Sequence, residues 1–163
     1  MNIFVLHKHP VRAAQMQCDR HVVKMVLESA QMLCTAINVL GGETPYKSAH
    51  VNHPCSVWAR QSLGNWLWLH DHGMALAMEY TKRYGKTHKS QAVIEEALKA
   101  SDTVALSDLK RTPFVLCMPD EHKTNDPVES YRRFYIEDKS RFARWDKNTQ
   151  APGWWPQGGA KAA

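Results

Sequence analysis

The stretch DRHVVKMVLESAQMLCTAINVLGG, residues 19–42, has the pattern of a long and largely buried helix. Apolar residues lie on almost every side of it, which is typical of a helix in a protein core. Pro10 suits a first helical turn, and Gly41-Gly42 is a typical C-terminal cap. We therefore predict helix from Pro10 to Leu40, with Asp19 as the N-cap of a new segment if a short first helix precedes it.

The same start and stop signals predict three more helices. Residues 54–84 form one, opened by Pro54 and ended by Gly85, with Gly64 as a bend. The other two cover residues 90–100, with Ser90 as N-cap, and residues from Pro127 to about Trp145.

Residues outside these helices carry no clear periodicity. The apolar run at residues 2–6 is either a strand or a tucked terminus, and residues 101–126 hold three turn-forming sites. We predict an all-α fold, a compact single domain of about four helices with long irregular loops. It covers residues 1–150, and a Gly/Pro/Trp-rich tail follows at residues 151–163.

Length and composition limit the class of protein. The 163 residues are 44% hydrophobic and 23% charged, which excludes wholesale disorder. There is no run of 18 apolar residues and no signal-peptide pattern, so we expect a cytoplasmic protein without membrane contact. A net charge of +5 favours a polyanionic partner, DNA or a nucleotide. We expect a monomer, with a dimer as the alternative.

A narrow polar stripe runs along the helix of residues 19–40. At 100° per residue, five side chains fall within an arc of about 80°: His21, Lys24, Glu28, Gln31 and Thr35. A narrow stripe on an otherwise apolar helix is expected to face a cleft or the interior.

Two interpretations of this stripe stay open. Lys24 and Glu28 are four residues apart and can form a purely structural ion pair. In a functional site, Glu28 would be a general base or would stabilise a cation. His21 would then be an acid or a ligand clamp, and Lys24 a phosphate contact or a Schiff-base amine.

A second polar cluster lies at the junction between a loop and the helix of residues 54–84. A helix N-terminus binds anions through its free N–H groups, so this junction is a candidate phosphate site. The alternative is a capped helix, with His53 or Asn52 as the cap and Trp58 in the core. The candidate binding residues are His50, Asn52, His53, Trp58 and Arg60.

The four cysteines form no CxxC pair and are most simply buried apolar residues. A zinc site would have to use Cys18-x-x-His21 or His50-x-x-His53-x-Cys55, and neither is a standard spacing. We therefore expect no metal and no cofactor.

The N-terminal third resembles the pyrimidine dimer DNA glycosylases and a group of uncharacterised phage proteins. The resemblance rests on the short apolar start, a proline, and Asp19-x-His21-Val22 with Glu28 nine residues after Asp19. It implies a small all-α protein that kinks DNA, excises one base of a lesion and cuts the backbone by β-elimination. The nucleophile of the family is the N-terminal α-amine, and a glutamate stabilises the sugar cation.

Carried onto this sequence, the resemblance gives Glu28 the role of that glutamate, and His21 helps to shape the site. Asn2 replaces the family's small second residue, so Met1 is expected to be retained. The nucleophile would then be the Met1 amine or Lys24. Leu27 and Gln31 stand where the family has phosphate-gripping arginines, which is a second departure from its pattern. Gln31, a member of the polar stripe, is also a candidate nucleic-acid or phosphate contact.

The leading hypothesis is thus a DNA N-glycosylase, with abasic-site lyase activity as a further step. One alternative is a transferase or hydrolase that modifies a nucleotide or base on the same scaffold. Another is a non-enzymatic phage protein that binds a nucleotide or DNA. A phage-encoded chain would act in the cytoplasm of the host cell.

Overall fold

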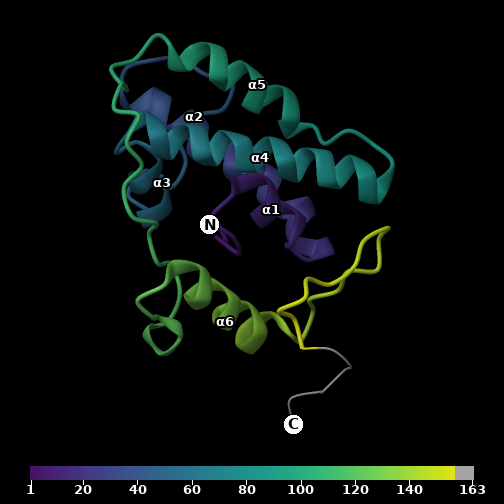
Figure 1. The fold of residues 1–163 in the computed structure, drawn as a ribbon. Helices are drawn as coiled ribbons and strands as arrows, with labels where there is room; N and C mark the ends of the chain where they lie inside the picture. Colours follow the sequence, from purple (N-terminus) through teal and green to yellow (C-terminus); the bar gives the residue numbers. More distant parts are fainter. Residues whose placement is uncertain (157–163) are drawn as a thin grey trace.

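The computed structural model describes residues 1–156, and this part of the chain is helical without strands (Figure 1). It contains α1 (Pro10–Gln15), α2 (Asp19–Val39), α3 (Pro54–Ala59), α4 (Leu63–Tyr84), α5 (Ser90–Ser101), the 3-10 helix η1 (Asp120–His122) and α6 (Pro127–Lys139). The predicted all-α class is confirmed. The four longer helices, α2, α4, α5 and α6, correspond to the four that the sequence predicts.

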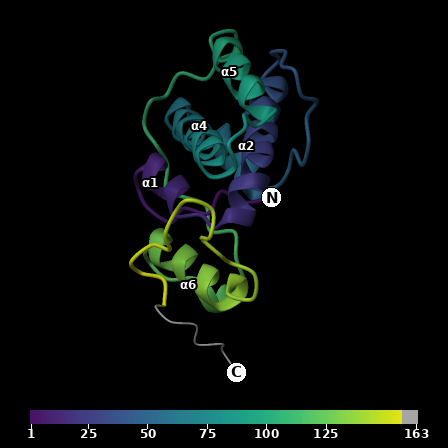
Figure 2. The ribbon, with the colours of Figure 1, turned by 90° about the vertical axis from the view of Figure 1, so that its right-hand side faces the viewer.

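Helix α2 is the centre of the fold. It packs against α3, α4 and α5, while α1 packs on α4. Helix α6 lies on the other side of the N-terminal segment, together with the C-terminal part of the chain (Figures 1 and 2). By length and hydropathy α2 could cross a membrane, but 67% of its most apolar stretch is buried inside the protein, as in a core helix.

The N-terminal segment runs through the interior between these two parts. Residues Ile3, Phe4, Val5 and Leu6 are all almost inaccessible to solvent and form no strand, so the terminus is tucked. This burial matters for function, because it brings the first two residues of the chain to the side of α2.

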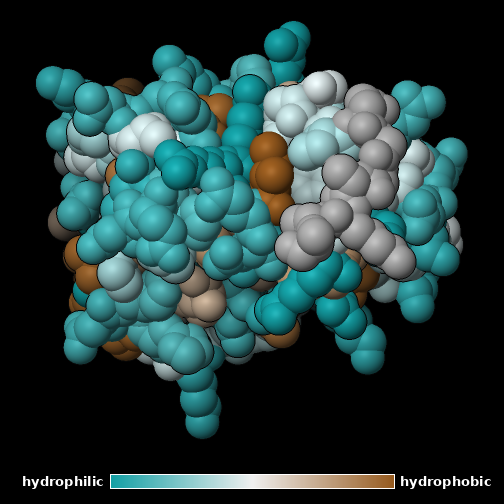
Figure 3. Space-filling model, turned by 90° about the horizontal axis from the view of Figure 1, so that it is seen from below, coloured by the Kyte–Doolittle hydropathy of each residue, from teal (hydrophilic) through white to brown (hydrophobic). Residues whose placement is uncertain are grey.

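The C-terminal segment closes the lower side of the molecule. Trp145, Trp154 and Trp155 gather around Tyr135 of α6, with ring centroids 6.2–6.4 Å from the tyrosine ring. The face seen from below is mostly hydrophilic (Figure 3). Helix α6 therefore buries aromatic side chains on one side and meets solvent on the other.

Three predicted features of the helices are wrong. The helix expected over residues 54–84 is broken after Ala59, because Ser62 adopts an extended backbone and caps α4 by accepting a hydrogen bond from the Asn65 N–H. Gly64 is the second residue of α4 and so cannot bend a continuous helix; it allows a close approach, since a Cβ there would lie 2.4 Å from the Leu109 carbonyl oxygen. Helix α6 ends at Lys139, earlier than predicted.

Asp19 is the first residue of α2 and not its N-cap, which is Cys18. The Asp19 carboxylate is directed instead towards Arg83 in the last turn of α4. The Arg83 guanidinium is fully buried and lies 3.2 Å from Asp19 and 3.0 Å from Glu79. It also donates to the carbonyl groups of Gln15 and Gln17. This network joins the α1–α2 turn to α4.

We expect Arg83→Met to lower the free energy of unfolding by about 3–5 kcal/mol, because it leaves the buried Asp19 carboxylate without a cation and Glu79 with only the exposed Lys82 at 3.9 Å. Urea unfolding followed by circular dichroism measures the change. Arg133→Met is the matched control, since the Arg133–Glu137 pair lies on the surface and should contribute less than about 1 kcal/mol. Equal losses in the two variants would contradict the assignment.

Candidate active site

A cavity of about 420 Å³ opens between α2, α6 and the N-terminal residues. Its walls combine one acid, several cations and aromatic rings. The lining residues are Met1, Asn2, Phe4, Arg20, His21, Lys24, Met25, Glu28, Phe134, Lys139 and Phe142. Of the predicted catalytic residues, the structure brings all four together here: Met1, His21, Lys24 and Glu28.

Glu28 is the acid of this cavity and is only 8% exposed. One of its carboxylate oxygens accepts a hydrogen bond of 3.1 Å from the Asn2 backbone N–H and lies 3.7 Å from the Met1 amino nitrogen. The other oxygen lies 3.4 Å from the Lys24 ammonium. Lys24 is 65% exposed, so it pairs from the solvent side, while the chain terminus pairs from the buried side.

Asn2 holds the chain terminus in this place. Its side-chain amide donates a 2.8 Å hydrogen bond to the Cys117 carbonyl, and its amide oxygen accepts from the Ile3 N–H. From the sequence, Asn2 is only a departure from the family pattern, and this positioning role is not predicted. The available signal was a polar residue at the start of a buried apolar run.

His21 forms an aromatic wall of the cavity. Its ring stacks on Phe4 at 4.4 Å, and its Nδ1 lies 2.7 Å from the Tyr135 hydroxyl. Burial lowers the pKa of the imidazole to about 3, and three nearby cations add to the effect, Lys139, Lys24 and Arg20. His21 is therefore neutral at physiological pH and cannot supply a proton as a general acid there.

The hydrogen-bond network assigns the tautomer of this neutral ring. The Tyr135 hydroxyl accepts a hydrogen bond from the Cys18 N–H, so its own proton is free for His21. Nδ1 of His21 then accepts, and Nε2 carries the ring proton. Tyr135 thus orients the imidazole from α6.

Cations and aromatic rings meet at the mouth of the cavity. The Arg20 guanidinium lies 5.2 Å from the Phe142 ring, and the Lys139 ammonium lies 4.3 Å from the Phe134 ring. Burial lowers the pKa of Lys139. Such a rim can attract an anionic phosphate and also stack on a planar base.

Gln31 does not reach this cavity. It lines a separate hollow with Leu27, Pro45, Tyr46 and Lys47. The predicted polar stripe therefore divides in three. His21, Lys24 and Glu28 share the cavity, Gln31 faces the other hollow, and Thr35 is buried and bonds to the Ala49 backbone.

The second predicted cluster does not form a common binding surface. His50 and Asn52 are exposed, and His53 caps α3 by accepting a hydrogen bond from the Cys55 N–H, as one of the alternatives predicted. Arg60 donates to the Val51 carbonyl and so holds its own loop.

Trp58 is 2% exposed, and its indole N–H donates to the Pro113 carbonyl. It packs against Trp68 and Phe114 in the core. The assignment of Trp58 to nucleic-acid binding is therefore wrong, because a ligand cannot reach a side chain buried to this degree.

Comparison with known proteins relates this site to a family. The family model of the pyrimidine dimer DNA glycosylases matches residues 1–92. The chain belongs to the pyrimidine dimer DNA glycosylase family. Membership supports a DNA glycosylase-like enzyme whose substrate is DNA. No curated protein and no solved structure matches the chain.

The matched part contains Met1, His21, Lys24 and Glu28. Helix α6 follows it in the sequence and supplies Phe134 and Lys139 to the same cavity. The cavity of this family member is thus completed by a segment outside the family match.

Acid conditions should destabilise the fold through His21. A histidine of the unfolded chain has a pKa of about 6.5. Because the folded pKa is about 3, only the unfolded state takes up this proton between these values, and the free energy of unfolding falls as the pH falls. His72, fully buried with a pKa of about 4, adds to the same slope.

We expect His21→Gln to flatten this slope by about 1.4 kcal/mol per pH unit between pH 6 and about 4. Urea unfolding at a series of pH values measures it. His9→Gln, at an exposed position, should leave the slope unchanged. A slope that is the same in His21→Gln and in the unsubstituted protein would refute the assignment.

Proposed function

We propose that the protein excises a damaged pyrimidine from DNA and then cleaves the abasic strand, with the Met1 α-amine as nucleophile and Glu28 as its acidic partner. The observation that carries the proposal is the 3.7 Å contact between the Met1 amine and the Glu28 carboxylate inside the cavity. Family membership supports the glycosylase step. The lyase step rests on the presence of an amine at the site.

The chemistry starts with the ion pair. Glu28 can accept a proton from the Met1 ammonium and leave a neutral amine, which is the nucleophilic form. The amine attacks C1′ of the deoxyribose, and the base leaves with the electron pair of the glycosidic bond. The leaving base takes up the proton that Glu28 had accepted, and the carboxylate, ionised again, stabilises the positive charge on the sugar.

Ring opening of the resulting aminal gives an imine between Met1 and C1′. Loss of a proton from C2′ then expels the 3′ phosphate by β-elimination, and water hydrolyses the imine to restore the amine. No cofactor is needed for these steps, because proton transfer and covalent catalysis by the amine account for every bond change.

The surroundings of Glu28 suit this chemistry. Arg20, Lys24 and Lys139 can bind the phosphates that flank the damaged nucleotide. Phe134 and Phe142 offer faces on which a displaced base can stack. His21 is neutral, so the ring adds no positive charge to the cavity and offers an aromatic wall to the substrate.

Borohydride trapping tests the proposal with two substrates. A duplex with a thymine dimer needs both steps, whereas a duplex with an abasic site needs only the amine. We expect a reduced covalent adduct with both. Glu28→Gln should lower cleavage of the glycosidic bond at the dimer at least about 100-fold, because it removes both the proton acceptor and the negative charge. Glu95→Gln, on the exposed face of α5, is the matched control.

The nucleophile is identified by two further proteins. A Gly-Ser extension ahead of Met1 moves the free amine away from Glu28 and should abolish the adduct. Lys24→Ala should keep it. The reverse result would transfer the nucleophile to Lys24. Absence of an adduct with both substrates, together with an intact glycosidic bond in the dimer duplex, would reject the glycosylase-lyase function.

A further inference from the structure

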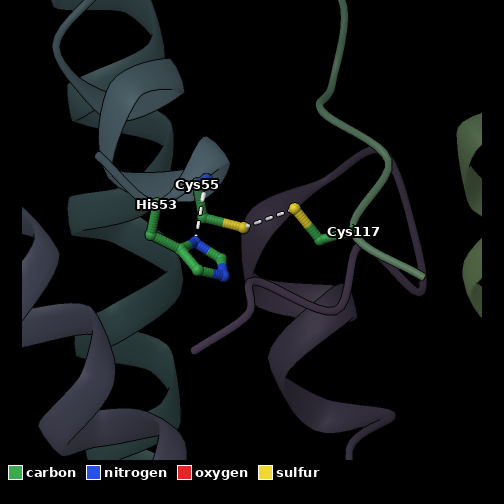
Figure 4. A group of neighbouring side chains, drawn as sticks. All are labelled: His53, Cys55 and Cys117. Carbon is green, nitrogen blue, oxygen red and sulfur yellow. Dashed lines mark hydrogen bonds between the residues drawn. The ribbon is translucent and has the colours of Figure 1, made fainter. Parts of the chain in front are cut away.

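Three potential metal ligands meet beside the N-terminal segment, outside the groups that the glycosylase chemistry uses (Figure 4). His53 and Cys55 lie at the start of α3, and Cys117 comes from the long loop between α5 and η1. The two Sγ atoms are 3.3 Å apart, although the residues are 62 positions apart in the sequence. One ring nitrogen of His53 and both sulfurs all lie within 4.8 Å of one another.

We propose that these three side chains bind a zinc ion. Two thiols and an imidazole form a donor set that zinc prefers, and three protein ligands leave one position of a tetrahedron for a further group. With Zn–S bonds of about 2.3 Å, the two sulfurs of a tetrahedral site lie about 3.8 Å apart. The sulfurs therefore need to separate by only about half an ångström to accept the ion.

The other two cysteines show that this arrangement is not a general property of the core. Cys18 and Cys34 are both fully buried, and among residues 1–156 neither belongs to a group that could hold a metal. Cys55 is buried, whereas His53 and Cys117 are half-buried. The site is thus close enough to the surface for an ion to enter.

Ligation would exchange one contact for others. In the structure, Nδ1 of His53 accepts a hydrogen bond from the Cys55 N–H and caps α3. A neutral imidazole that binds metal through one nitrogen carries its proton on the other, so this cap bond is lost whichever nitrogen is used. Both thiols release their protons to solvent on ligation, and the two bonds from sulfur to the ion would replace the weak hydrogen bond from Cys55 to Cys117.

The position of the site gives it a consequence for the active site. The Cys117 carbonyl accepts the hydrogen bond from the Asn2 side chain, and the Ser56 hydroxyl contacts the Met1 sulfur at 3.5 Å. An ion that joins Cys117 to α3 therefore holds both sides of the segment that places the Met1 amine beside Glu28. We assign the ion a positioning role.

Cobalt binding tests the site directly, without relying on enzyme activity. The full-length protein is reduced, freed of reductant and titrated with Co²⁺. Ligation by cysteine gives a thiolate-to-cobalt band in the near ultraviolet and the visible bands of a tetrahedral ion. We expect one ion per chain, displaced by Zn²⁺, and a higher melting temperature when Zn²⁺ is present.

Cys117→Ser and Cys55→Ser should each weaken binding by more than the 10–100-fold typical of an outer-shell substitution, about 100-fold or more. Cys34→Ser is the matched control and should bind as the unsubstituted protein does. Circular dichroism of each variant without metal verifies the fold, and His53→Ala provides a variant that leaves all thiols in place.

Three results would overturn the proposal. The reduced protein could fail to take up Co²⁺ or Zn²⁺. The cobalt spectrum could persist in the Cys55→Ser/Cys117→Ser double variant. Thiol titration of freshly purified protein could find only two of the four cysteines free, and the same protein could bind no ion after reduction. Cys55 and Cys117 would then be a disulfide pair and not zinc ligands. Uptake of one ion that depends on Cys55 and Cys117 but not on Cys34 would establish the site.

Discussion

The burial of a single carboxylate governs the functional half of this protein. Glu28 lies on the central helix at 8% exposure, where an unpaired negative charge would cost several kcal/mol. Its partners are the chain terminus, the Asn2 amide and Lys24. The chain terminus lies beside this buried carboxylate, and residues 3–6, which follow it, are buried in the interior. Helix α6 lies on the other side of this segment.

The second half of the chain turns this ion pair into a site. Helix α6 contributes Tyr135, which orients His21, as well as Phe134 and Lys139 at the cavity. Its position depends on the aromatic cluster around Tyr135 and on the Asp146 N–H, which donates to the same Asp19 carboxylate that pairs with Arg83. Helix α2 thus carries both the Asp19–Arg83 ion pair at its start and the Glu28 carboxylate of the cavity further along.

The proposed zinc site extends this dependence to the loop before η1. Glu28 determines where the terminus must lie, while Asn2 and the Cys117 carbonyl determine how it is held there. The contacts of Asn2 with Glu28 and with the Cys117 carbonyl make a retained Met1 and a bulky second residue compatible with the proposed N-terminal nucleophile. The Asn2 side chain is a tether for the amine, and its size is accommodated by the loop that it binds.

The sequence alone predicted the helical class and the existence of four long helices, because proline, glycine and capping residues mark helix ends. It also grouped His21, Lys24 and Glu28, because their spacing places them on one face of a helix. It could not decide that Gln31 faces another hollow, that Trp58 is core, or that Asn2 anchors the terminus. Those outcomes depend on which loops pack over each helix, and so do the meeting of Cys117 with Cys55 and the completion of the cavity by α6. Contacts between segments that are separated in the sequence leave no periodic signal along any one helix, so only the tertiary structure reveals them.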